Sequence, residues 1–105
     1  MEMIIMKEPA IDISVYLDSE GKIKQYPAQE KKKKLVVEYL AGKFEEDRIY
    51  TEKEVNAIIN QWHTFGDYFI LRRMLIEYGF MGRKPNGSEY WVIKRQEKDA
   101  ETANG

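Results

Sequence analysis

Two helix-start signals lie thirteen residues apart in the middle of the chain, and this spacing limits the possible folds more than any other feature. Thr51 and Glu54 form a capping-box pattern, in which Ser or Thr is followed three residues later by Glu or Gln. Thr64 and Asp67 repeat the same kind of signal. The helix that begins first therefore has room for about three turns before a short turn leads into the next helix.

Elements on both sides of this pair are also visible in the sequence. Apolar residues spaced for one face of a helix predict a helix over residues 28–44. Ile49 and Tyr50 are expected to form a very short strand before the capping box. The third helix is expected to run to about Tyr78, where Gly79 ends it.

Both ends of this helical unit are expected to carry a β-hairpin. At the C-terminal side, Asn86-Gly87 lies in a turn between residues 80–84 and 89–94, and this dipeptide is the strongest local signal in the chain. At the N-terminal side, a turn at residues 18–21 separates a returning strand, residues 22–26, from an alternating apolar segment. The apolar residues of that segment are Ile11, Ile13, Val15 and Leu17.

The order of these elements predicts an α+β fold. Three helices followed by a twisted hairpin are the order of a winged helix-turn-helix domain, here with an added N-terminal hairpin. We expect one domain over residues 11–95, a loosely ordered lead-in over residues 1–10 and a disordered tail over residues 96–105.

Composition excludes several classes of protein. A chain of 105 residues fits one small domain, and the absence of cysteine excludes a disulfide scaffold and a zinc finger and fits a reducing cytoplasm. No apolar run approaches the roughly 20 residues that a membrane span needs. His63 is the single histidine, and neither a nucleophile elbow nor a glycine-rich phosphate loop occurs. We therefore expect no enzyme activity, no cofactor and no metal site.

A net charge of −1 conceals an uneven distribution of charged residues. Residues 22–34 contain six lysines and one glutamate, and residues 72–95 contain six basic and two acidic residues. In a winged helix the third helix can enter the major groove while the wing contacts phosphates. The candidate nucleic-acid-binding residues are Arg73, Arg83, Lys84, Lys94 and Arg95, with Lys31 and Lys34 from the first helix. Ordinary solvated surface charge is an equally good explanation of the same residues.

The third helix contains one arginine inside its apolar arc and one outside it. Arg72 falls between Tyr68 and Ile76 on the helical wheel, so we expect its guanidinium to form a structural ion pair with Glu54 or Asp67. Arg73 faces away from the core and is the better candidate for a base or phosphate contact.

Two apolar residues flank Arg73 and support a different function. Phe69 and Ile70 lie beside the outward face of the third helix, and exposed apolar groups suit a protein interface better than a groove lined by phosphates. The alternative is therefore a protein-interaction or dimerisation module with a winged-helix scaffold that does not bind DNA.

Several stretches resemble a bacterial family catalogued as domain of unknown function 2087. They include Ile-Tyr-Thr-Glu-Lys-Glu-Val-Asn at residues 49–56 and Asn-Gly-Ser-Glu-Tyr-Trp at residues 86–91. The other stretches are residues 17–27, 62–67, 71–76 and 79–83. The resemblance implies a winged-helix-like domain of the kind often found C-terminal in regulators resembling ArsR-type transcription factors.

Together these features favour a non-enzymatic cytoplasmic protein that binds nucleic acid, as a transcriptional regulator or an accessory to one. Duplex DNA, a second copy of the chain or another regulator protein are the partners that this hypothesis allows, and a membrane is not among them.

Overall fold

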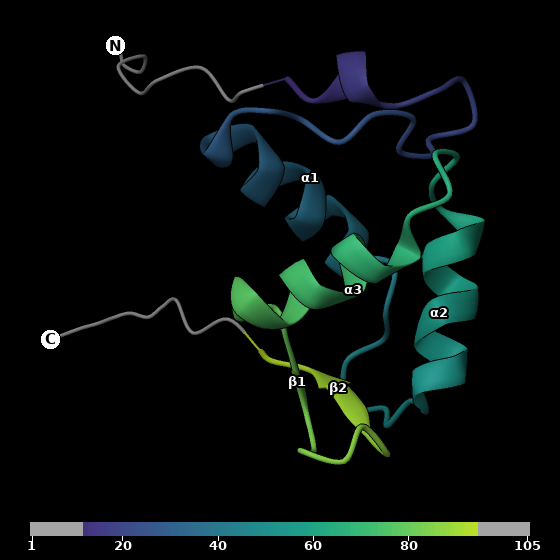
Figure 1. Cartoon of the computed structure of the whole chain (residues 1–105), viewed down its shortest axis with the longest axis vertical. Coiled ribbons are helices and arrows are strands. Elements are labelled where there is room, and N and C mark those ends of the chain that lie inside the picture. Colours follow the sequence, from purple (N-terminus) through teal and green to yellow (C-terminus); the bar gives the residue numbers. More distant parts are fainter. Residues whose placement is uncertain (1–11, 95–105) are drawn as a thin grey trace, which may run out of the picture.

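The computed structural model describes residues 12–94, which form three helices followed by a two-stranded antiparallel sheet (Figure 1). The helices are α1 (Glu30–Ala41), α2 (Glu52–Gln61) and α3 (Tyr68–Glu77), and the strands are β1 (Met81–Arg83) and β2 (Tyr90–Val92). The α+β class and this order of elements were expected. The predicted lead-in at residues 1–10 and the predicted tail at residues 96–105 lie outside the described residues.

The segment before α1 does not form the predicted hairpin. Residues Ser14–Tyr16 are a short 3-10 helix, and only Leu17 and Ile23 form an antiparallel bridge across the turn. Val15, expected to face inward, is 65% exposed, and Ile11 lies outside the described residues. The predicted turn itself is present, because the Asp18 carboxylate accepts backbone N–H bonds two and four residues later.

Ile23 fastens the N-terminal segment to the helical unit. Its N–H donates to the carbonyl of Trp62 at 2.8 Å, and its carbonyl accepts the N–H of Thr64 at 2.9 Å. Both backbone groups of Ile23 therefore bond to the connection between α2 and α3, and its side chain is fully buried. The bridge to Leu17 is formed on the other edge of this residue, and the 3-10 helix at Ser14–Tyr16 limits that pairing to one bridge.

Helix α1 is shorter than the predicted helix over residues 28–44. Gln29 precedes it without a side-chain capping bond, and Gly42 follows its last turn. Val36 and Leu40 are buried as expected, and Val37 and Ala41 are buried as well. The wider buried face arises because α3 lies against one side of α1 while the N-terminal segment crosses another (Figure 1).

The two helix-start signals behave differently. At α2 the capping box is complete: Thr51 Oγ1 accepts the N–H of Glu54, and the Glu54 carboxylate accepts the N–H of Thr51. At α3 the cap is Asp67, whose carboxylate accepts the N–H of Ile70 at 3.2 Å. Thr64 caps no helix, because it lies in the turn bound to Ile23. The second signal, residues 64–67, therefore marks the turn, and its last residue, Asp67, is the N-cap of α3.

The C-terminal hairpin is confirmed, with shorter strands than predicted. β1 and β2 pair antiparallel with Gly82 opposite Trp91, and Gly87 in the turn has φ of 76°, as the Asn-Gly signal requires. Tyr50 adds a single antiparallel bridge to Tyr90, in place of the expected short strand. The hairpin is thereby joined to the chain just before α2.

A single core fills the space between the helices and the hairpin. Its fully buried side chains come from every helix and include Val36, Leu40, Val55, Ile59, Leu71 and Leu75. His63 is also buried, with Nδ1 2.7 Å from the carbonyl oxygen of Ile59 and its ring edge-on to Phe65. Helix α3 packs against α2, α1 and β1, and the face that is left, which includes Phe69 and Arg73, is exposed to solvent.

Candidate nucleic-acid interface

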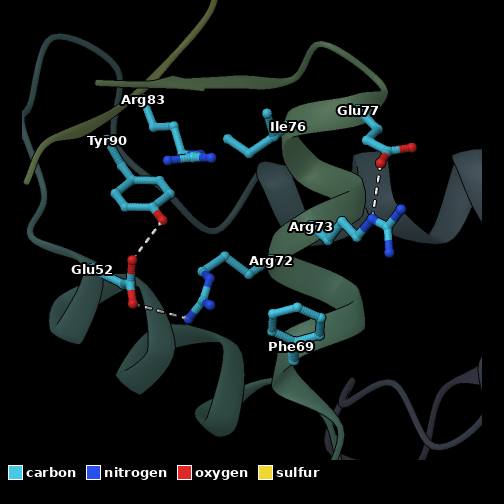
Figure 2. Close-up of a pocket in the computed structure, with 8 residues that line it drawn as sticks. All are labelled: Glu52, Phe69, Arg72, Arg73, Ile76, Glu77, Arg83 and Tyr90. Atoms are coloured by element: carbon cyan, nitrogen blue, oxygen red, sulfur yellow. Dashed lines mark hydrogen bonds and ion pairs between the residues drawn. The ribbon is translucent and has the colours of Figure 1, made fainter. Parts of the chain in front are cut away.

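A cleft of about 410 Å³ opens where α2 begins, beside α3 and the hairpin (Figure 2). We call it the arginine cleft, because three of its lining residues are arginines. The lining residues are Glu52, Phe69, Arg72, Arg73, Ile76, Glu77, Arg83 and Tyr90. Three arginines and two glutamates leave the lining with a net charge of +1.

Arg72 is the fixed cation of the cleft. Its Nη1 donates to Oδ1 of Asn56 at 2.6 Å and lies 3.6 Å from Oε2 of Glu52, and its side chain is 16% exposed. The expectation of a carboxylate partner is met, but the partner is neither Glu54 nor Asp67. Glu52 and Asn56 are four residues apart, so they share the face of α2 that meets α3.

The two carboxylates expected to pair with Arg72 have other roles. Glu54 closes the capping box of α2 and lies 3.8 Å from the guanidinium of Arg48. Asp67 caps α3. Both carboxylates therefore accept backbone N–H groups at the first turn of their own helix, and neither forms an ion pair with Arg72.

Glu52 connects three elements of the cleft. Besides contacting Arg72 on α3, its Oε1 accepts the hydroxyl of Tyr90 on β2 at 2.9 Å. Burial raises the pKa of Tyr90, and the hydrogen bond to Glu52 raises it further, while the charges of Arg72 and Arg83 lower it. In Figure 2 Arg72 and Tyr90 both turn toward Glu52. The cleft wall is therefore a hydrogen-bonded unit across α2, α3 and the hairpin.

Arg83 is the free cation of the cleft. It lies at the end of β1, and its Nη1 donates to the carbonyls of Lys84 and Pro85, both at 3.2 Å. Within residues 12–94, no carboxylate lies within ion-pair distance of Arg83. Two long hydrogen bonds to the carbonyls of exposed residues hold the guanidinium only weakly. A bound anion can therefore replace these carbonyls as its hydrogen-bond partner with little loss of free energy.

The other predicted cations of this region are paired at the surface. The pairs are Arg73 with Glu77 at 2.9 Å, Lys84 with Glu89 at 3.4 Å and Lys94 with Asp47 at 2.8 Å. Every one of these side chains is more than 40% exposed. The hydrogen bond to Asp47 raises the pKa of Lys94. Arg95 lies outside the described residues.

Lys31 and Lys34 lie apart from the arginine cleft. Both are exposed on α1, and within the described part of the chain none of the four lysines at residues 31–34, which we call the lysine run, has a carboxylate within ion-pair distance. Figure 1 shows the start of α1 and the hairpin turn far from each other, with α3 between them. The structure therefore does not bring the lysine run and the hairpin cations onto one surface.

Phe69 and Ile70 have different environments. Phe69 is 56% exposed at the edge of the arginine cleft, with its ring centre 5.5 Å from the guanidinium carbon of Arg72. Ile70 is partly buried and packs against the core. Only one of these two residues therefore offers a large exposed apolar surface.

Four lining residues of the cleft were not among the candidates chosen from the sequence. They are Glu52, Ile76, Glu77 and Tyr90. A usable signal exists for Glu77, since it lies four residues after Arg73 on a helix, a spacing that pairs opposite charges. No comparable signal identifies Tyr90, because it reaches Glu52 across 38 positions of sequence.

These observations define an α+β domain of three helices and a hairpin with an arginine-lined cleft on the outer side of α3. The family model described as an uncharacterized protein conserved in bacteria, DUF2087, matches residues 22–92, and the chain belongs to this family. Comparison with curated proteins and with solved structures finds no match.

The described residues contain neither a candidate membrane span nor a candidate metal site. Over residues 12–94, no helix is long and apolar enough to cross a membrane. In the same residues, no group of three or more His, Cys, Asp or Glu side chains has an arrangement that could hold a metal ion.

Proposed function

We propose that this protein binds nucleic acid through the arginine cleft, with α3 and the hairpin acting as the helix and wing of a winged-helix domain. The observation that carries this proposal is that three arginine side chains from two elements line one open cleft. Arginine is the residue best suited to such a role, because its planar donors match the oxygens of a phosphate.

The surface ion pairs do not oppose this function strongly. Exposed pairs such as Arg73 with Glu77 stabilise a protein by only about 0.2–1 kcal/mol, so exchanging the glutamate for a phosphate costs little. The same holds for the pairs of Lys84 and Lys94 on the hairpin. Arg72 is different, since two side chains from α2 hold it and it is mostly buried.

These differences assign separate roles to the basic residues. Arg83 and Arg73 contact phosphates, Lys84 and Lys94 add contacts along the hairpin, and Arg72 positions the cleft wall; Arg95, outside the described residues, follows Lys94 in the sequence and adds positive charge. Lys31 and Lys34 attract the nucleic acid over a longer range without entering the contact surface. A regulator of transcription, or an accessory to one, is the biological role that such binding supports.

The test is a fluorescence anisotropy titration of the whole chain with labelled oligonucleotides, single-stranded and duplex, at about 50 and 200 mM salt. Arg83→Gln removes the free guanidinium of the cleft without breaking an ion pair. Lys24→Gln is the matched control, because Lys24 is also exposed, has no carboxylate within ion-pair distance among the described residues and lies in the segment before α1.

We expect Arg83→Gln to weaken binding about tenfold, the effect of losing one charge-assisted contact of about 1.4 kcal/mol. The slope of log affinity against log salt should also fall by close to one phosphate contact, while Lys24→Gln changes neither quantity by more than about twofold. Absence of binding to any oligonucleotide at low salt, or affinity that does not fall with salt, would contradict the proposal.

The alternative function is a protein-interaction or dimerisation module. Phe69 supports it, but this ring and its neighbour Tyr68 are the only large exposed apolar side chains of α3, and the others, Val15, Ile49 and Ile93, lie on separate segments of the described chain. Each aromatic side chain supplies about 150–250 Å² at most, whereas a stable interface needs about 800 Å² per partner. The nucleic-acid function is therefore the better supported one.

Sedimentation of the wild type and of Phe69→Asp separates the two functions. Phe69 is the appropriate residue, because a charge at the partly buried Ile70 would disturb the core as well as any interface. A wild-type dimer that Phe69→Asp converts to a monomer would favour the alternative. If the wild type and Phe69→Asp are both monomers, the alternative function as a dimerisation module is excluded.

A further inference from the structure

Phe69 is an aromatic ring that the fold leaves exposed at the edge of the arginine cleft. It occupies the second position of α3 and retains 56% of its surface exposed, although many apolar residues around it are packed into the core. An exposed phenyl ring gains nothing from water, and a single one is too small to be a protein interface. The residues around Phe69 indicate which chemical group this ring can bind.

The ring is held next to an immobilised cation. The guanidinium carbon of Arg72 lies 5.5 Å from the centre of the Phe69 ring, within the range of a cation–π contact. Asn56 and Glu52 fix that guanidinium from α2, and Asp67 caps the turn of α3 that carries Phe69. The ring is therefore presented on a rigid element rather than on a loop.

The outward face of α3 is poorly suited to reading a duplex. Besides Arg73 and the mostly buried Arg72, the residues of this helix that border the cleft are Phe69, Ile76 and Glu77. Base edges in a major groove are recognised by side-chain hydrogen bonds, which two apolar groups cannot form, and the carboxylate repels the backbone. The same residues suit an unstacked base, because a base without a partner can lie on an aromatic ring.

The size of the cleft agrees with this occupant. Its volume of about 410 Å³ lies near the lower end of the range for sites that enclose a small molecule, about 300–1,000 Å³. That space admits a group of the size of one nucleotide. Arg83 lies across the cleft from α3, where it can bind a phosphate of the same strand (Figure 2).

We propose that the arginine cleft binds single-stranded nucleic acid, with one unpaired base stacked on Phe69 and the adjoining phosphates bound by Arg83 and Arg73. This inference rests on the proposed function and specifies the form of its ligand. Stacking on an aromatic ring tolerates every base, so binding is weakly dependent on sequence. Its strength depends on salt through the two arginines.

The experiment compares single strands of about 12 nucleotides with the duplex of the same sequence, as DNA and as RNA, by fluorescence anisotropy. The variants are Phe69→Ala, Phe69→Leu and Phe69→Trp. Phe69→Leu keeps an apolar side chain without a ring, and Phe69→Trp keeps a ring. Tyr68→Ala is the matched control, since Tyr68 is the preceding aromatic residue of α3 and does not line the cleft.

We expect the single strand to bind at least tenfold more tightly than the duplex. Phe69→Ala and Phe69→Leu should both weaken single-strand binding about 5- to 150-fold, the range for loss of one stacked base, whereas Phe69→Trp retains it. Tyr68→Ala should change it less than about threefold. Unfolding curves of all variants should coincide with that of the wild type to within a few degrees, because both rings are exposed.

Two results overturn the inference. If the duplex binds as tightly as the single strand, or if Phe69→Leu binds as well as the wild type, no base is stacked on this ring, while the proposed binding of nucleic acid stands. If no oligonucleotide binds at low salt, the proposed function fails and this inference fails with it.

Discussion

The lysine run on α1 and the arginine cleft are both basic, but the fold treats their charges differently. The lysines at residues 31–34 are consecutive on one helix, and no described carboxylate lies within ion-pair distance of them. In the cleft, the cations come from α3 and β1, and Arg72 is held by two side chains of α2.

Each region also contains a tyrosine that donates its hydroxyl to a glutamate. Tyr78 at the end of α3 donates to Glu30 at the start of α1, and Tyr90 donates to Glu52 in the cleft. Both bonds connect one element to another. The difference lies in the cations: near Glu30, Lys31 and Lys34 are exposed and Lys33 lies over the Tyr26 ring, whereas Arg72 shares the Glu52 carboxylate with Tyr90.

This difference bears on how a basic surface can bind a ligand. A solvated lysine loses side-chain entropy whenever a ligand orders it, whereas Arg72 is already ordered by folding and holds the cleft wall beside which Arg73 and Arg83 lie. Charge alone raises the rate of encounter, and positioned charge adds affinity and selectivity. The four predictions below test whether the cleft is the positioned region and the lysine run the solvated one, in order of decreasing expected effect.

The largest effect is expected from Arg72→Gln, which should lower the free energy of unfolding by about 2 kcal/mol. The reason is that Glu52 and Asn56 lose a charged hydrogen-bond partner in a partly buried site. Urea unfolding measures this value. Arg73→Gln, one position along the same helix, is the matched control and should cost less than about 0.5 kcal/mol, since its ion pair is exposed. Equal losses for the two variants would contradict the view that the cleft wall is preorganised.

The second prediction concerns Tyr90→Phe. At neutral pH the variant should be less stable by about 1 kcal/mol, because the hydrogen bond to Glu52 is lost. The pKa of Tyr90 is raised in the folded state, so its contribution is present below the ordinary tyrosine pKa of 10.0 and is lost as pH rises through the folded pKa. The stability difference between wild type and variant should therefore shrink above about pH 10.

Tyr78→Phe is the counterpart of this variant beside the lysine run. Burial and the hydrogen bond to Glu30 raise the pKa of Tyr78 as well, so the same loss of stability at alkaline pH is expected in the wild type and should be reduced in this variant. Circular dichroism during urea titrations at several pH values measures both. If the stability difference between the wild type and Tyr90→Phe grows above pH 10, the raised pKa of Tyr90 does not explain it.

The third prediction concerns Glu77→Gln, which should strengthen binding to oligonucleotides about twofold to threefold. Two causes act in the same direction: Arg73 is released from its ion pair, and an acidic group leaves the edge of the cleft. Anisotropy at low salt measures the change. Glu45→Gln in the loop after α1 removes the same charge away from the cleft and should have a smaller effect. Weaker binding by Glu77→Gln would argue against phosphate contact by Arg73.

The smallest effect on binding is expected from the double variant Lys31→Gln and Lys34→Gln. Its affinity for oligonucleotides should fall less than about twofold at 0.15 M salt, because exposed charges beyond the contact surface are screened over about 8 Å. Its stability should rise by about 0.3–1 kcal/mol, since Lys31 lies in the first turn of α1, where a positive charge opposes the macrodipole. A tenfold loss of affinity would instead make the lysine run part of the interface.

Much of the fold was predictable because its signals are local. The capping box at Thr51 and Glu54, the helix end at Gly79 and the Asn86-Gly87 turn each depend on residues within a few positions of one another, and all three are present in the structure. The N-terminal hairpin was predicted from alternation and a turn; the turn is present, but the pairing is limited to the bridge between Leu17 and Ile23, because Ser14–Tyr16 form a 3-10 helix in place of a strand. The backbone of Ile23 also bonds to the turn after α2, a contact between distant residues that the local pattern does not show.

The site was predictable only in part, for a related reason. The helical wheel correctly indicates that Arg72 lies toward the core and needs a partner, but a wheel contains no information on how α2 is rotated against α3. The rotation brings Glu52 and Asn56 toward Arg72 and leaves Glu54 at the helix start. The same packing brings Tyr90 to Glu52 across the hairpin.

The sequence by itself therefore determined that three helices and a C-terminal hairpin form and in which order, and that positive charge gathers in residues 22–34 and 72–95. The tertiary structure alone decided which of these charges are held and which are solvated. Helix starts and turns depend on short-range sterics and hydrogen bonds between near neighbours. Ion-pair partners depend on the packing of whole elements against a shared core, and that packing is settled by contacts that are distant in sequence.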